Sequence, residues 1–187
     1  MRDETRRQAI VDAARACFLQ FGYAKTSLDD IAKRANISRP LIYRKFRNKE
    51  AVFGAVYDAT FDARYPAADR VMAGPGSARD KLLRVYEAVC VDAWALLAGT
   101  PMVDEFYEAC MQVVPEIVAK HERKRLGYTK QLLGSTAVAE VFMLAVEGLM
   151  LDTPTVAVFH RRLVVLVDRF APAARAGRSP RRRVPRM

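Results

Sequence analysis

The stretch TSLDDIAKRANISRPLIYRKF, residues 26–46, holds two short helical patterns separated by a turn. Thr26 or Ser27 can cap the first helix, because a side-chain hydroxyl at that position accepts a hydrogen bond from a free backbone N–H. Asp29 and Asp30 follow in the first turn, where the helix dipole favours anions. Four side chains are expected to face inward: Leu28, Ile31, Ala32 and Ala35. This half of the stretch therefore predicts a short helix with one buried face.

The turn that follows centres on Asn36. Asparagine is one of the few residues other than glycine that tolerate a positive φ, which a sharp turn requires. Ser38 can then cap a new helix that has Pro40 in its first turn, where a missing backbone N–H costs little. Ile42 and Phe46, four residues apart, are expected to anchor this helix to the preceding ones.

The second helix keeps a polar and basic face turned outward, made of Arg39, Leu41, Tyr43, Arg44 and Lys45. Side chains of these kinds contact phosphates and base edges. Two short helices joined by a tight turn, the second with a free basic face, predict a helix-turn-helix motif with a recognition helix.

A longer helix is expected before this motif, over residues 5–21. Thr5 and Gln8 have the spacing of a capping box, and Gly22 supplies a left-handed residue to end the helix. Its apolar stripe repeats at helical spacing: Ile10, Ala13, Ala14, Cys17, Phe18 and Phe21. The N-terminal part of the chain is therefore predicted to be a three-helix DNA-binding domain.

These motifs resemble the DNA-binding segment of the TetR family of bacterial transcriptional regulators over roughly residues 5–55. The matching stretches are FLQFGYAKTS, DDIAKRA, LIYRKF and NKEAVF, in that order and spacing. Two positions depart from the usual pattern. Asn36 stands where the family commonly has glycine, and Lys45 stands where histidine or tyrosine is common, which puts one phosphate contact in question.

The resemblance implies which residues contact DNA. Phosphates would be held by Thr26, Tyr43 and Lys49, with Arg44 and Lys45 also on the backbone. The major groove would be approached by Ser38, Arg39, Pro40 and Leu41. Lys49 also follows a candidate cap, Asn48, at a helix N-terminus, where an ammonium and free N–H groups together favour a phosphate. Two plainer readings stay open: Tyr43 covers the core of the domain with its ring, and Arg44 and Lys45 are ordinary solvated charges.

The formal net charge of +10 is concentrated at the two ends of the chain. Residues 1–50 contain 12 basic and 6 acidic residues, whereas residues 51–171 contain 13 basic and 15 acidic ones. Residues 172–187 contain six arginines and no acidic residue. A basic end on a nearly neutral body is typical of polyanion binding, and a solvated basic face is the alternative. The last segment is predicted to be a disordered basic tail, because it has almost no large apolar group.

The remainder, residues 51–171, shows helical periodicity and no alternating strand pattern, so the fold class is all-α. A fourth helix is expected to run on from Asn48 until AGPGSARD interrupts it. Further helices are expected from Ser77 to Gly99, over MVDEFYEACMQVV, from Pro115 to about Leu133, over 136–151 and over 154–170. The predicted division is a DNA-binding domain, 1–50, and a helical ligand-binding and dimerisation domain, 51–171.

The last two predicted helices are the most apolar. One stripe contains Val138, Phe142, Ala145 and Leu149, widened by Val141 and Val146, and its partner contains Phe159, Leu163, Leu166 and Phe170. The resemblance implies that these helices form a four-helix bundle in a homodimer, whose paired recognition helices reach successive major grooves. The alternative is that both stripes only close the core of one chain.

A pocket for a small effector is predicted among the helices of the second domain. The candidate wall residues share large rings, soft side chains or isolated polar groups: Tyr86, Cys90, Trp94, Met102, Phe106, Cys110, Val114, His121 and Phe142. This composition favours an apolar, aromatic molecule, and the resemblance implies a cavity in this place. The alternative is solid core, since aromatic stripes at helical spacing usually pack.

Other function classes find little support. The chain has two histidines, no glycine-rich phosphate loop and no paired metal motif, so neither an enzyme nor a cofactor is expected. The three cysteines lack metal-ligand spacing and are expected to be reduced and buried. No apolar run suits a membrane span or a secretory signal, which predicts a cytoplasmic protein.

The resulting hypothesis is a homodimeric repressor that a small apolar molecule releases from an inverted-repeat operator. The rivals are a nonspecific helical DNA-binding protein without an effector and a helical enzyme.

Overall fold

The computed structural model describes residues 2–171, and all regular elements within this range are helices, as predicted. They are α1 (Arg2–Phe21), α2 (Leu28–Arg34), α3 (Arg39–Lys45), α4 (Lys49–Asp62), α5 (Tyr65–Ala73), α6 (Ala78–Tyr86), the π-helical η1 (Glu87–Val91), α7 (Asp92–Trp94), α8 (Val103–Val113), α9 (Pro115–Leu133), α10 (Thr136–Gly148) and α11 (Val156–Phe170). The basic tail predicted for 172–187 lies outside the described residues.

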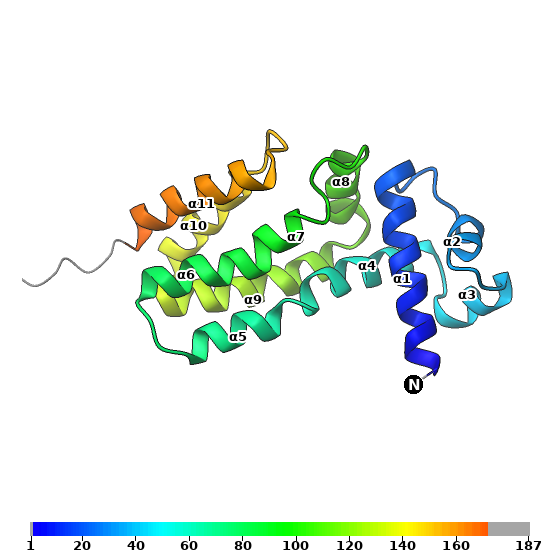
Figure 1. Ribbon diagram of the computed structural model, residues 1–187, viewed down its shortest axis with the longest axis horizontal. Helices are drawn as coiled ribbons and strands as arrows, with labels where there is room; N and C mark the ends of the chain where they lie inside the picture. The colour runs from blue at the N-terminus through cyan, green and yellow to red at the C-terminus, as the bar shows by residue number, and fades with distance from the viewer. Residues whose placement is uncertain (1, 172–187) are drawn as a thin grey trace, which may run out of the picture.

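Helices α1–α3 form a head at one end of the elongated molecule, and α5–α11 form a body at the other (Figure 1). Helix α4 leads from the head into the body. The ring of Phe53 on α4 lies 5.0 Å from that of Phe18 in the head and 5.2 Å from that of Phe106 in the body. The boundary predicted after residue 50 therefore falls in the first turn of a helix that both parts share.

Helix α1 begins earlier than the sequence pattern predicted. Because it begins at Arg2, Thr5 lies inside the helix, and the predicted cap at Thr5 is wrong. The predicted end is confirmed, since Gly22 has φ +85° and its N–H donates to the carbonyl of Phe18. Helix α1 packs on α2 and α4, so it provides the base on which the helix-turn-helix rests.

The fourth predicted helix is in fact two helices. Helix α4 ends at Asp62, and α5 starts at Tyr65 with Pro66 in its first turn. A proline inside one continuous helix would remove a backbone hydrogen bond and clash with the preceding turn, whereas the first turn of a new helix accepts it. Pro66 was thus the sequence signal for this break.

The helix predicted from Ser77 begins as expected, with the Ser77 hydroxyl accepting from the N–H of Asp80 at 3.1 Å. It passes through η1, a π-helical segment that the apolar periodicity did not reveal. Seven side chains at helical spacing along this segment are buried: Leu82, Tyr86, Val89, Cys90, Ala93, Trp94 and Leu97. Helix α9 has the predicted bounds, Pro115–Leu133.

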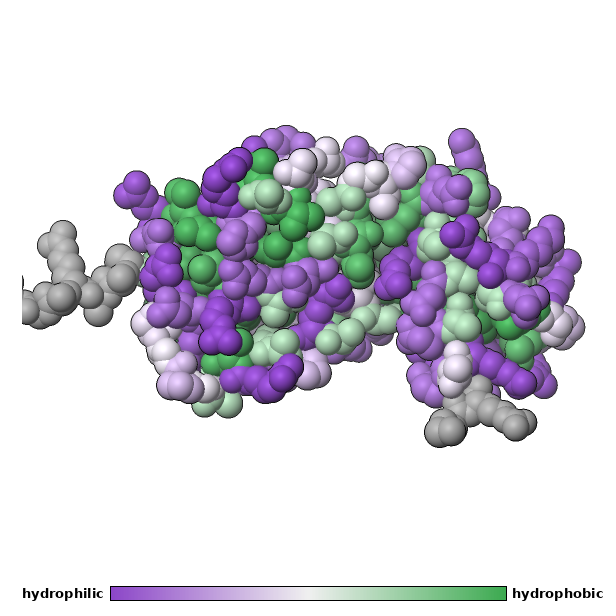
Figure 2. Space-filling model, viewed as in Figure 1, coloured by the Kyte–Doolittle hydropathy of each residue, from purple (hydrophilic) through white to green (hydrophobic). Residues whose placement is uncertain are grey.

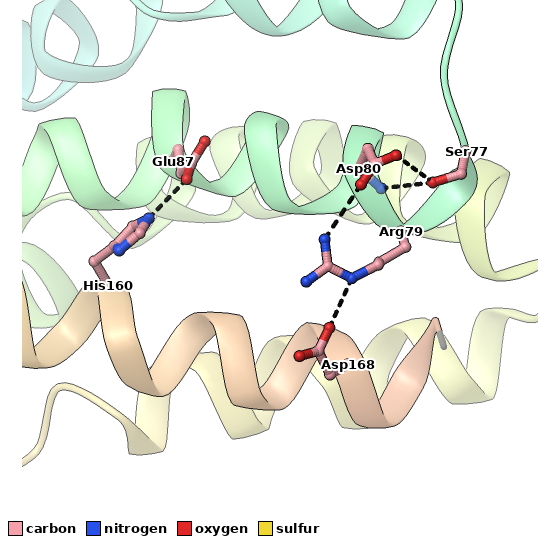
Figure 3. A network of polar contacts seen from close by, with 6 residues as sticks. All are labelled: Ser77, Arg79, Asp80, Glu87, His160 and Asp168. Atoms are coloured by element: carbon pink, nitrogen blue, oxygen red, sulfur yellow. Dashed lines mark hydrogen bonds and ion pairs between the residues drawn. The ribbon is translucent and has the colours of Figure 1, made fainter. Parts of the chain in front are cut away.

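Helices α10 and α11 close the body of a single chain. Phe142, Phe159 and Leu163 have no exposed surface, so these residues belong to the core and not to an outward seam. Two polar contacts tie α11 to the α6–η1 segment: Arg79 Nε to Asp168 Oδ1 at 2.7 Å and His160 Nε2 to Glu87 Oε1 at 2.7 Å (Figure 3). The single-chain alternative is therefore correct for these buried positions.

Other apolar side chains of the same two helices are exposed: Val138 (40%), Val141 (56%), Leu144 (66%) and Val165 (57%). In the space-filling view, hydrophilic residues cover most of the head, and hydrophobic patches reach the surface of the body (Figure 2). Within residues 2–171, no helix combines the length and the apolar character that a membrane crossing requires.

Candidate nucleic-acid interface

The helix-turn-helix is built by local hydrogen bonds that the sequence predicted in part. Ser27 and Asp30 form a complete capping box at the start of α2. Asn36 has φ +51°, and the N–H of Ile37 donates to the carbonyl of Ala32 at 3.0 Å. The chain therefore reverses direction within the turn and can begin α3 at Arg39.

Helix α3 is fixed by its apolar side and leaves its polar side free. Ile42 and Phe46 are buried, as predicted, while Tyr43 is 48% exposed. The reading in which Tyr43 only covers the core does not fit this exposure. Ser38 precedes the helix, but its side chain makes no capping hydrogen bond, and its carbonyl accepts from the N–H of Leu41 at 3.0 Å. The Ser38 hydroxyl is thus exposed beside the start of α3.

Arg39 is oriented by contacts with α2 and with its own helix. Its Nε lies 3.0 Å from Asp29 Oδ1, and its guanidinium carbon lies 5.8 Å from the ring centre of Tyr43. A hydrogen bond with Tyr43 and the charge of Asp29 raise the pKa of Arg39. The Arg39 side chain is 65% exposed, so the outer edge of its guanidinium group faces solvent while Nε stays near Asp29.

Lys45 has a partner that the sequence did not predict. Its ammonium forms an ion pair with Asp3 at the start of α1, and only 18% of its side chain is exposed. A hydrogen bond from Lys45, together with its charge, lowers the pKa of Asp3. Lys45 therefore ties α3 to α1, and a phosphate would have to compete with Asp3 for it.

Thr26 and Lys49 both stabilise the loop between α1 and α2. Thr26 is buried, and its hydroxyl donates to the carbonyl of Gly22 at 2.7 Å. Lys49 Nζ donates to the carbonyl of Tyr23 at 2.9 Å and lies 4.3 Å from the Tyr23 ring centre. The predicted Asn48 cap of α4 is present, with Oδ1 accepting from the N–H of Ala51. Phosphate contacts by Thr26 and Lys49 remain predictions.

An open groove of about 400 Å³ runs between the start of α1 and α3. Its walls include four of the residues predicted to contact DNA: Ser38, Pro40, Leu41 and Arg44. Arg6 of α1 also lines the groove and was missed. The only signal for Arg6 was the pair of adjacent arginines at residues 6 and 7, since nothing local shows that α1 and α3 meet there.

The head is joined to the body by Glu105 of α8. Its carboxylate accepts from the N–H of Ala24 at 3.1 Å, and a β-carbon at residue 22 would overlap it. The N–H of Met102 also donates to the carbonyl of Leu19 at 3.3 Å. The loop that precedes α2 is therefore held from the body as well as by Lys49.

The predicted effector-binding residues are distributed over several places. Tyr86 and Phe142 meet edge to face at 5.0 Å, and Tyr86 shares a 2.7 Å hydrogen bond with Thr129. Trp94 Nε1 donates to the carbonyl of Pro154 at 2.8 Å. Burial raises the pKa of Cys90 to about 11 and that of Cys110 to about 12, so both thiols are protonated near neutral pH. These side chains are packed as core.

The other four candidates lie in different surroundings. Phe106 turns toward Phe53 of α4, and Val114 is buried near Gly54. Met102 lines an open groove of about 750 Å³ beside Cys17 and Phe21 of α1. His121 is enclosed by the rings of Tyr57, Phe61 and Tyr65. The nine candidates thus do not share one cavity in this structure.

Arg125 is an interior cation that the sequence pattern did not reveal. Only 13% of its side chain is exposed, and its nearest carboxylate oxygen, Glu147 Oε1, is 4.0 Å away. Its guanidinium carbon lies 5.6 Å from the ring centre of Phe61. Arg125 lies in the charged stretch KHERKR, and helical periodicity alone did not show which of these charged side chains turns inward.

The comparisons agree with this architecture. Residues 10–56 match the family described as bacterial regulatory proteins, tetR family. The HTH-type transcriptional regulator YhgD of Bacillus subtilis (strain 168) is 30% identical over 125 residues, which cover 67% of this chain and 65% of YhgD. The chain therefore matches less than two thirds of that relative's length.

Two solved structures share the fold. SmeT, the repressor of the Stenotrophomonas maltophilia multidrug efflux pump SmeDEF, has a TM-score of 0.64 at 20% identity, covering 93% of this chain and 97% of that one. The TetR-like regulator LfrR from Mycobacterium smegmatis, in complex with proflavine, has a TM-score of 0.60 at 22% identity, covering 89% and 96%. Because both sequence identities are low, these similarities show a shared fold only.

Proposed function

We propose that this chain is a regulator of the tetR family, which its residues 10–56 match, and that it represses transcription by binding an inverted-repeat operator; its fold, shared with the repressor SmeT, supports this. The observation that carries this proposal is the free face of α3, where Arg39, Tyr43 and Arg44 are exposed beside a groove. The enzyme reading is set aside, since the family consists of regulators. Such a repressor would act in the cytoplasm, where it meets chromosomal DNA.

The residues in and around the groove are proposed to have different roles. Arg39 and Leu41 lie near the start of α3, the end from which a recognition helix contacts base edges. Arg44 and Arg6 are cations on the rim, which suits phosphates. Thr26 and Lys49 would act by shaping the loop before α2 and by adding a contact at the N-terminus of α4.

A homodimer is part of the proposal. A single α3 reads only half of an inverted repeat, and two recognition helices must lie about one helical turn of DNA apart, roughly 34 Å. The exposed apolar side chains of α10 and α11 support a partner surface on these helices. The partner would therefore be a second copy of this chain.

The release signal is proposed to be a small, largely apolar molecule bound in the body. Support comes from the packed aromatic side chains Tyr86, Trp94 and Phe142 in the body and from the likeness in fold to LfrR, which was solved with proflavine. Arg125 adds one interior cation that could meet an acceptor group of such a molecule. Because these residues are packed in the structure, ligand binding would have to open space among them.

The test is a selection of genomic fragments retained by the purified full chain. We expect a shared inverted repeat, and Arg39→Ala or Leu41→Ala should change which bases are preferred. An effector identified by its release of that DNA should also change the emission of Trp94, the only tryptophan in the chain, with the same midpoint. Retention of DNA without a common site would contradict the operator and favour a nonspecific DNA-binding protein.

A further inference from the structure

Asp58, Asp62 and His121 bring three metal-ligating groups together at the junction of α4 and α9. Asp58 and Asp62 are four residues apart on α4, so their carboxylates lie on one face of that helix. His121 faces them from α9, and its Nε2 lies 2.8 Å from Asp58 Oδ1. One ligand atom from each of the three residues lies within 4.8 Å of the others.

The imidazole of His121 is held in the orientation that a metal ligand needs. Its Nδ1 is 2.7 Å from the hydroxyl of Tyr65, and its ring stacks on the Tyr65 ring with a centre distance of 5.6 Å. The side chain is 1% exposed. Metal-bound histidines usually have the second ring nitrogen hydrogen-bonded in this way, which fixes the ring and leaves the other nitrogen for the ion.

A cationic group already occupies the space between the carboxylates. Lys120 Nζ lies 2.7 Å from Asp58 Oδ1 and 3.6 Å from Asp62 Oδ2. The Lys120 side chain is 51% exposed and flexible, so it can turn out into solvent. The site thus attracts a positive charge, and a divalent ion would attract the same two carboxylates more strongly than one ammonium does.

Solvent can reach the carboxylates through a cavity of about 570 Å³ between α1 and α4, which Asp58 and Asp62 line. The opposite wall carries Arg7 and Arg15 of α1. Arg15 is paired with Asp12 at 2.9 Å, which reduces its repulsion of a cation. The open side of the site leaves room for water ligands to complete the coordination.

We propose that Asp58, Asp62 and His121 bind one divalent transition-metal ion, with Lys120 displaced from between the carboxylates. Two carboxylate oxygens and one imidazole nitrogen suit Zn²⁺ or Co²⁺, whose bonds to such ligands are about 2.0–2.2 Å long. Side-chain rotation has to open the 2.8 Å contact between His121 Nε2 and Asp58 Oδ1 and turn all three ligand atoms toward one ion. The ion would link α4, which begins in the head, to α9 of the body.

Calorimetric titration of metal-depleted, tag-free full chain with Zn²⁺ tests the proposal, and Co²⁺ absorption reports the ligand geometry. We expect one ion per chain. Asp62→Asn should weaken binding by about tenfold or more, because it removes one charged ligand at a half-exposed position without disturbing the core. Lys120→Met should strengthen binding by about tenfold, because the competing ammonium is gone.

The chain provides matched controls. Lys124 lies 3.9 Å from Asp69 one turn further along α9, in a similar surface pair without a histidine. Lys124→Met and Asp69→Asn should leave metal binding unchanged, and so should His160→Gln, which alters the other histidine of the chain. Absence of binding, or binding that ignores both Asp62→Asn and Lys120→Met, would overturn the proposal. Metal binding is measured without DNA, so neither result depends on the proposed operator.

Discussion

Single side chains on the DNA-facing surface differ in how freely they can reach a phosphate. Arg44 is exposed on α3, whereas Lys45 is paired with Asp3 and Lys49 donates to the loop carbonyl of Tyr23. A free cation releases counterions from DNA when it binds, but one that must first leave an internal partner gains less. Of these three side chains, Arg44 is therefore expected to contribute most clearly to the salt dependence of DNA binding.

Arg44→Ala is predicted to weaken binding to all sequences and to lower the slope of log K against log salt by about 0.9, the value for one lost phosphate contact. Fluorescence anisotropy of a labelled operator over a salt series measures both quantities. Lys130→Ala, an exposed lysine of α9 in the body, serves as the matched charge control. A slope that stays at the wild-type value would remove Arg44 from the phosphate contacts.

The residues that organise the turn could be predicted from the sequence, while their distant partners could not. Ser27, Asn36 and Asn48 act through their own neighbours, so composition and spacing revealed them. The ion pair of Lys45 with Asp3 joins residues on different helices, and it depends on how α3 packs against α1. No local pattern contains that information.

Helix α11 is held against the rest of the body by buried apolar side chains and by polar contacts. Phe159, Leu163 and Val167 have no exposed surface, whereas the tie between Arg79 and Asp168 is partly exposed, with 24% and 48% of the two side chains accessible (Figure 3). Exposed ion pairs contribute about 0.2–1 kcal/mol, because solvent screens them and ordering long side chains costs entropy. Apolar burial should therefore dominate.

Leu163→Ala is predicted to lower the free energy of unfolding by about 2–5 kcal/mol, and Arg79→Ala by less than about 1 kcal/mol. Urea denaturation followed by circular dichroism gives both values under the same conditions. Arg161→Ala on the exposed side of α11 is the control and should have little effect. Equal losses from Leu163→Ala and Arg79→Ala would show that the polar tie matters more than its exposure indicates.

Helix boundaries were predictable where capping residues and prolines mark them. Ser77 and Pro115 gave the starts of α6 and α9, and Gly134, with φ +74°, ends α9. The break before α5 was missed because the apolar periodicity continues across it. The π-helical turn of η1 has no composition of its own, because packing against neighbouring helices decides whether one extra residue is accommodated.

The junction between head and body depends on the absence of a side chain at Gly22. This residue has φ +85°, and the carboxylate of Glu105 lies where its β-carbon would be. Gly22→Ala should therefore destabilise the chain by more than the about 1–2 kcal/mol expected from a left-handed backbone alone. Adding Glu105→Ala should recover part of the loss, although the hydrogen bond to Ala24 is then missing.

A double-mutant cycle of these two changes, measured by urea denaturation, isolates the steric coupling. Glu108→Ala, a second glutamate on the exposed side of α8, is the control in place of Glu105→Ala and should not restore stability. Strictly additive losses from Gly22→Ala and Glu105→Ala would mean that the loop and α8 separate readily. The head would then be less firmly attached to the body than the structure indicates.

The sequence patterns predicted a dimer surface but did not show which residues of the last two helices would form it. Both apolar stripes of the last two helices were visible, but periodicity did not separate the half that fills the core from the half that faces outward. The structure makes that separation, since Phe142 and Phe159 are fully buried while Val141 and Leu144 are 56% and 66% exposed. The proposed dimer surface therefore consists of the outward half, and core positions are unsuitable for testing it.

Val141→Asp combined with Leu144→Asp is predicted to make the protein monomeric, because two charges would be buried without partners in the proposed interface. The fold of each chain should be retained, since both side chains are exposed within one chain. Operator affinity should fall steeply, because one head then holds only a half-site. Sedimentation velocity gives the mass, and circular dichroism verifies the helices.

Met111→Asp, which alters a 60% exposed apolar residue on α8, should leave the dimer intact. A dimer that survives Val141→Asp with Leu144→Asp would mean that another surface joins the two chains.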